Sequence, residues 1–188
     1  YYFFFFSFVA VFMPFFSLYL KSLGFTYLQI GILISISPVT KIFGPYLIGR
    51  FADFKSDKGS VLKLLSLLVF IIFFLIYFEI NFAGYFIYLF FLHFFLSGIM
   101  PLVESETLEF LEDRKNFYGL IRVWGSVGFL VTVYMVGILI DKFGLKIFSI
   151  SAHFFLLLIF LCSFYMCGKK VEKKSNNLNF SIKKIILK

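Results

Sequence analysis

The chain has 188 residues, of which 61% are hydrophobic and only 15% are charged, and its net charge is +8. A soluble domain has about half apolar and about a quarter charged residues, so this composition excludes an ordinary water-soluble fold. The apolar residues form long blocks without the alternation of barrel strands, which predicts an all-α integral membrane protein.

Six apolar blocks have lengths near the roughly 20 residues that a helix needs to cross a bilayer. We predict a bundle of six transmembrane helices over residues 1–20, 28–50, 61–80, 84–108, 118–140 and 145–167. The connections at residues 79–83 and 141–144 are so short that the helices they join must be antiparallel neighbours.

Basic residues are distributed unequally between the two ends of this bundle. Most lysines and arginines fall at the end where the chain starts, and the opposite end receives only Lys21, Lys142 and Lys146. The positive-inside rule then predicts a multi-pass protein of a bacterial-type cytoplasmic (inner) membrane, with both chain ends cytoplasmic. The same distribution favours contact with anionic membrane lipid and argues against a nucleic-acid partner.

The residues after the sixth block are polar and rich in lysine, which is typical of a linker. We therefore predict a six-helix bundle over residues 1–167, followed by a basic cytoplasmic linker over residues 168–188. The chain does not begin with Met and starts inside a predicted helix. We expect a fragment, with a C-terminal half following the linker.

Glu104 is an acid deep inside the fourth block, where a charge costs about 2.5–3.5 kcal/mol even on a lenient scale. At 100° per residue, Glu106 and Glu109 lie about 200° and about 140° away from it around the helix. Those two acids belong to a face that reaches the boundary of the membrane, as expected for a solvated helix end. Glu104 points the other way and needs another explanation.

Arg122 lies at a similar depth in the fifth block, and Ser126 and Phe129 lie within about 40° of it around the helix. A short loop joins the two blocks, so an ion pair between Glu104 and Arg122 is geometrically plausible. One interpretation is a solute site beside a water-filled cavity, where arginine can donate two hydrogen bonds to a polar solute. The other is a buried pair that only ties two helices, which is a poor stabiliser. We favour the first.

Lys41 is a third charge within a block, about 13 Å along the helix from Arg50 at 1.5 Å per residue. Its ammonium could extend to the lipid headgroups. Ser37 and Pro45 share its face, however, which favours a cavity wall and a role in substrate binding.

The six blocks divide into three plus three. Residues 44–53 and 137–144 both run from a glycine through apolar residues to an aspartate and a basic residue, and they fall at opposite ends of the bundle. An inverted-topology repeat predicts this reversal. Chance similarity between helix ends explains a single short match equally well.

Several segments resemble the lactose-permease and phenylpropionate-permease branch of the major facilitator superfamily. They are residues 2–20, residues 101–104, residues 116–129 and the run from Gly49 and Arg50 to Asp53. The last is similar to the signature loop of the superfamily, and the resemblance implies a gating role for it. The resemblance also implies the N-terminal half of a twelve-span proton symporter that works by alternating access.

In the lactose-permease pattern, Glu104 and Arg122 match the charged pair that binds sugar hydroxyls. Phe129 matches the aromatic position that stacks on the sugar ring, which is Trp in that pattern, so lactose itself is not the expected solute. In the aromatic-acid branch, Arg122 or Lys41 would bind a carboxylate. The proton-coupling residues of the pattern would lie in the C-terminal half.

We therefore predict a secondary active transporter, a proton symporter for a small polar or carboxylated organic solute, with no enzymatic activity, cofactor or metal. Its partners would be the solute, protons, membrane lipid and the C-terminal half. Two alternatives stay open. One is a six-span half-transporter that acts as a homodimer, and the other is a membrane assembly or scaffold protein that transports nothing.

Overall fold

The computed structural model describes residues 1–55 and 57–166. They form α1 (Tyr2–Ser22), α2 (Tyr27–Lys55), α3 (Lys58–Phe73), α4 (Phe82–Leu111), α5 (Tyr118–Phe143) and α6 (Lys146–Met166). Two 3₁₀ helices, η1 (Phe74–Tyr77) and η2 (Glu112–Phe117), extend α3 and join α4 to α5. Six segments are long and apolar enough to cross a membrane, which confirms the predicted six-span all-α bundle. The predicted linker over residues 168–188 lies outside the described residues.

Local side-chain chemistry sets several helix boundaries. The carboxylate of Asp57 accepts the backbone N–H of Ser60 at 3.0 Å and caps the start of α3. The amide oxygen of Asn81 accepts the N–H of Gly84 at 2.8 Å and caps α4 in the same way. Gly144, at φ 82°, ends α5 in a conformation that residues with a side chain rarely adopt.

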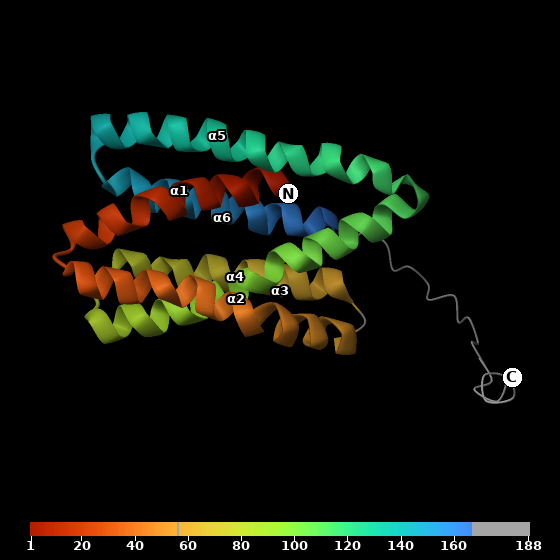
Figure 1. Cartoon of the computed structure of the whole chain (residues 1–188), viewed down its shortest axis with the longest axis horizontal. Coiled ribbons are helices and arrows are strands. Elements are labelled where there is room, and N and C mark those ends of the chain that lie inside the picture. The colour runs from red at the N-terminus through yellow and green to blue at the C-terminus, as the bar shows by residue number, and fades with distance from the viewer. Residues whose placement is uncertain (56, 167–188) are drawn as a thin grey trace, which may run out of the picture.

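Successive helices run antiparallel, so their connections alternate between the two ends of the bundle (Figure 1). The start of α1, the α2–α3 and α4–α5 connections and the end of α6 share one end. We name it the basic end, because it carries Arg50, Lys55, Lys58, Lys63, Arg114 and Lys115. The opposite end carries Lys21, Lys142 and Lys146.

The helix packing follows the division into three plus three. Helix α1 packs mainly against α5 and α6, helix α4 packs mainly against α2 and α3, and α3 also contacts α6. The contacts of α1 with α5 and α6 thus correspond to the contacts of α4 with α2 and α3, so the two sets of three helices pack in equivalent ways. Because each set has three antiparallel helices, the second set starts at the opposite end of the bundle, as an inverted repeat requires.

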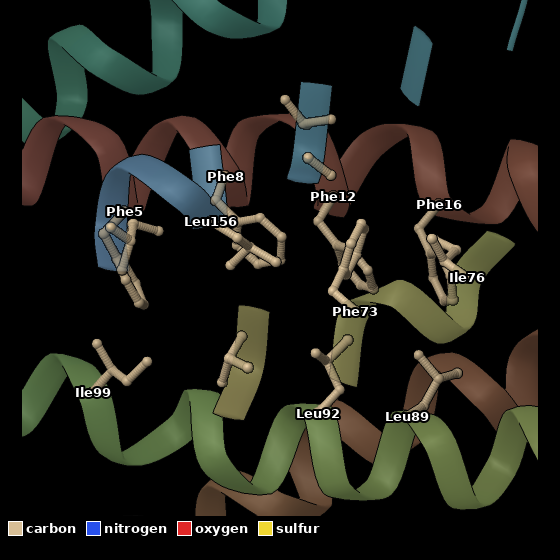
Figure 2. Close-up of a cluster of buried hydrophobic side chains, with 14 of the residues drawn as sticks. Phe5, Phe8, Phe12, Phe16, Phe73, Ile76, Leu89, Leu92, Ile99 and Leu156 are labelled. Carbon is tan, nitrogen blue, oxygen red and sulfur yellow. The ribbon is translucent and has the colours of Figure 1, made fainter. Parts of the chain in front are cut away.

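Aromatic rings from α1 fill the middle of the bundle. Figure 2 shows four rings at helical spacing on the inward face of this helix: Phe5, Phe8, Phe12 and Phe16. They point toward a set of buried side chains from the other helices, namely Phe73, Ile76, Leu89, Leu92, Ile99 and Leu156. This packing fixes α1 as a central helix and places its first turn between α4 and α5.

Glycines let neighbouring helices approach closely. A Cβ built on Gly128 of α5 would lie 2.5 Å from the carbonyl oxygen of Phe3 in α1, and one built on Gly125 would lie 2.5 Å from the ring of Phe6. Helices α2 and α4 meet in the same way at Gly98. The close contact of α5 with α1 sets the position of the arginine at the start of α5.

Candidate solute-binding site

Glu104 of α4 and Arg122 of α5 form an ion pair near the basic end. Nη1 of Arg122 lies 3.0 Å from Oε1 of Glu104, and the two side chains are 51% and 31% exposed, respectively. Arg122 lies about 6 Å into α5 and Glu104 about 10 Å from the end of α4, at 1.5 Å per residue. The pair therefore lies inside the predicted spans but remains accessible from outside the bundle.

The backbone of α4 helps to bring its acid to α5. Pro101 interrupts the helical hydrogen bonds one turn before Glu104, because proline has no N–H to donate to the carbonyl of Ser97. In the same turn, the hydroxyl of Ser97 donates to the carbonyl of Phe94 at 2.7 Å. In Figure 1 the last part of α4 rises toward the start of α5, which η2 joins to it.

Hydroxyl groups that the sequence analysis did not single out lie beside the pair. Nη1 of Arg122 also donates to the hydroxyl of Tyr118 at 2.9 Å. Tyr2 of α1 donates to Oγ1 of Thr107 at 3.4 Å, and it lies within electrostatic range of Tyr118 and Glu104. The spacing of four residues between Tyr118 and Arg122 on one helix is a signal that could have identified this contact. No comparable signal links Tyr2 to α4.

Ser126 and Phe129 lie one and two turns farther along the same side of α5 as Arg122. Ser126 is exposed and Phe129 is half-buried. In the part of the chain that the structure describes, no hydrogen bond or ring contact joins either residue to the ion pair. They follow Arg122 along this side of α5, and their roles in binding stay predictions.

Lys41 belongs to another level of the membrane. It is exposed midway along α2, about 21 Å from Lys55 at 1.5 Å per residue. Its electrostatic neighbour is His93, a buried residue in the half of α4 nearer the opposite end. Among the described residues Lys41 forms no ion pair, and no contact joins it to Glu104 or Arg122.

The residues of the predicted signature loop lie in helix rather than in a loop. Helix α2 continues to Lys55, beyond its predicted end at Arg50, because the sequence after Arg50 has no proline or glycine before residue 59. Gly49, Arg50 and Asp53 therefore occupy the last turns of α2. Arg50 and Asp53 are exposed and form no ion pair within residues 1–55 and 57–166.

A second ion pair at the basic end joins α3 to α4. The ammonium of Lys58 contacts the carboxylate of Glu109 and donates to the hydroxyl of Ser105 at 2.8 Å. Glu109 is exposed, as predicted for a solvated helix end, and Glu106 is half-buried. The acids of α4 thus separate into a group that faces α3 and Glu104, which faces α5.

A profile of the MFS_1 like family matches residues 1–185. The chain belongs to the MFS_1 like family. This membership confirms the predicted resemblance to the major facilitator superfamily. Within the described residues, this member of the MFS_1 like family consists of six apolar helices arranged as three plus three.

Curated relatives of this MFS_1 like chain are named as transporters or permeases. It is 28% identical over 138 residues to the "Probable 3-phenylpropionic acid transporter" of Escherichia coli (strain K12), covering 73% of this chain and 36% of the relative. It is 31% identical over 144 residues to the "Maltose permease" of Geobacillus stearothermophilus, covering 76% and 36%. It is 25% identical over 173 residues to the "Uncharacterized transporter YwbF" of Bacillus subtilis (strain 168), covering 92% and 42%.

These matches cover between 36% and 42% of the relatives, so the chain spans about two-fifths of their length. No solved structure matches the MFS_1 like chain.

Proposed function

We propose that the chain forms the N-terminal bundle of a secondary active transporter, a proton symporter that moves a small polar organic solute by alternating access. Membership of the MFS_1 like family and the names of the curated relatives support transport rather than catalysis. The relatives continue well beyond the matched region. In this proposal a C-terminal six-helix half supplies the rest of the cavity and the proton-coupling groups.

The accessibility of the Glu104–Arg122 pair carries this proposal. A pair that only ties helices gains little from its Coulomb energy once desolvation is included. Here the arginine is 51% exposed, so its remaining N–H groups can reach a ligand. The pair combines donors on Arg122 with an acceptor on Glu104 and has no net charge, which suits neighbouring hydroxyl groups of a neutral, sugar-like solute.

A carboxylated aromatic solute is the second candidate, and Lys41 favours it. A carboxylate at Arg122 would have to compete with Glu104 for the same positive charge, because Glu104 already contacts the guanidinium. Lys41 is exposed at mid-membrane and forms no ion pair among the described residues, so it can accept an anion without such competition. The similarity to a protein named as a 3-phenylpropionic acid transporter supports this candidate.

In the membrane we place the basic end in the cytoplasm, following the positive-inside rule. Residues 1–167 would then form the bundle of an inner-membrane protein, and residues 168–188 would form a cytoplasmic linker on the lipid surface. Gly49, Arg50 and Asp53 would lie on the cytoplasmic side, where they would contact the C-terminal half during gating.

Uptake by the full-length protein in proteoliposomes tests the proposal. Labelled maltose and 3-phenylpropionate serve as the two probes, with and without an inwardly directed proton gradient. We expect gradient-stimulated uptake of one probe, and a loss of about 100-fold or more in Arg122→Ala and Glu104→Ala, as for truncation of a functional charge pair.

Wild-type uptake by both variants would refute the site assignment. It would favour a scaffold that tolerates loss of the pair. Uptake by the six-span chain alone would favour a homodimeric half-transporter.

A further inference from the structure

Tyr118 and Arg122 form a hydrogen-bonded pair on the first turns of α5. The hydroxyl of Tyr118 accepts Nη1–H of Arg122 at 2.9 Å, and the guanidinium carbon lies 5.9 Å from the centre of the tyrosine ring. The ring itself is half-buried and packs against the hydrophobic core. Ring and hydroxyl thus have separate surroundings: the ring meets the core, and the hydroxyl meets Arg122.

The two contacts of Nη1 constrain the whole guanidinium group. Nη1 carries two hydrogens, and it lies 2.9 Å from the Tyr118 hydroxyl and 3.0 Å from Oε1 of Glu104. Because the guanidinium is planar and rigid, two contacts at one nitrogen also fix the directions of the other N–H groups. In the described part of the chain, Nε and Nη2 of Arg122 make no hydrogen bond to protein.

We propose that Tyr118 is a positioning residue for solute binding. Its phenol holds Arg122 beside Glu104 while the Nε and Nη2 edge of the guanidinium stays available to the solute. This inference rests on the proposed function, because it concerns the same site. Without the phenol, an arginine that is 51% exposed can adopt other rotamers, and each binding event must then restrict them.

A chemical footprint of Arg122 tests the positioning without any solute. Phenylglyoxal condenses with the two terminal nitrogens of an accessible arginine, so engagement of Nη1 slows the reaction. The full-length protein in membrane vesicles is treated with phenylglyoxal, and the modified peptide is quantified by mass spectrometry. In Tyr118→Phe we expect Arg122 to react about tenfold faster, the size expected for loss of a hydrogen bond to a charged group.

A matched control variant separates loss of the hydrogen bond from a general increase in accessibility. Tyr134→Phe makes the same chemical change on the same helix at an exposed tyrosine, and it should leave the reaction rate of Arg122 unchanged. An unchanged rate in Tyr118→Phe, or an equal acceleration in Tyr134→Phe, would overturn the proposal.

Transport kinetics provide a second test of the positioning role of Tyr118. If maltose is transported, Tyr118→Phe should raise its KM about tenfold and leave kcat within about twofold, because lost pre-organisation acts on binding. A fall in kcat at unchanged KM would contradict positioning. If wild-type protein moves neither maltose nor 3-phenylpropionate while the footprint still accelerates in Tyr118→Phe, the solute assignment fails and the positioning of Arg122 stands.

Discussion

The carbonyl oxygen of Phe3 in α1 lies so close to Gly128 in α5 that a Cβ at Gly128 would be only 2.5 Å away. The backbone of α1 therefore limits how α5 can lie. Since Arg122 occupies the first turns of α5, the contact between Phe3 and Gly128 also sets where the guanidinium can reach.

Gly128→Ala should push α5 away from α1, because the backbone of Phe3 has no flexible end that can move aside. We expect overpacking to cost about 1–3 kcal/mol, to lower the melting temperature and to reduce solute uptake. Thermal unfolding in detergent and initial uptake rates measure the two effects. Gly137→Ala is the matched control on the same helix, since its Cβ would lie 3.7 Å from the ring of Phe15, an ordinary contact. Equal behaviour of the two variants would contradict the account.

A buried pair of hydroxyls supports the same interface. Thr132 of α5 donates to Oγ of Ser7 in α1 at 2.9 Å, and Ser7 donates to the carbonyl of Gly128 at 3.3 Å. Thr132→Val should therefore cost about 0.6 kcal/mol, the average for hydrogen bonds between membrane helices. Ser7→Ala removes both bonds and should lower the melting temperature more than Thr132→Val does. A larger loss from Thr132→Val than from Ser7→Ala would contradict this account of the two hydrogen bonds.

Glu104 and Glu109 lie on one helix but should respond differently to the same change. Glu109 is 48% exposed and contacts Lys58, which is 25% exposed, and ion pairs near the surface are worth about 0–1 kcal/mol. Glu109→Gln should therefore leave uptake within about twofold, whereas Glu104→Gln should remove most of it. Uptake rates of the two variants at matched expression decide this. Similar losses in both would mean that charge at the basic end, rather than the pair with Arg122, supports transport.

The sequence predicted the six helices well because the bilayer imposes a length and a composition on each of them. The predicted end of α2 at Arg50 came too early, since Phe51, Ala52 and Phe54 are as common in a helix as they are at a membrane boundary. The pairing of Glu104 with Arg122 could be anticipated from depth and angle.

The remaining surroundings of the pair depend on how helices pack, and sequence periodicity within one helix does not report that. Tyr2 and Thr107 meet only because α1 crosses between α4 and α5. The separation of Lys41 from the pair likewise follows from the levels of the residues along different helices.

Lys41→Gln separates the two solute classes. If the solute is a neutral polyol held by Glu104 and Arg122, maltose should keep its KM within about twofold, because Lys41 lies at another level and makes no contact with the pair. If the solute is an aromatic carboxylate, the loss of this intramembrane cation should abolish uptake of 3-phenylpropionate. The KM of the transported probe in wild type and variant is the measurement. Unchanged uptake of a carboxylate would exclude Lys41 from the site.

Arg122→Lys tests the central claim, which is that the Glu104–Arg122 pair binds solute. Lysine keeps the positive charge and the attraction to Glu104 but lacks the planar fork of N–H donors. The decisive measurement is the initial rate of solute uptake by the full-length variant in proteoliposomes, compared with wild type at equal protein content. We predict a melting temperature close to that of the wild type and an uptake rate lower by about 100-fold, as for a lost charged hydrogen-bond donor. Uptake within about twofold of the wild type would show that the pair only joins α4 to α5.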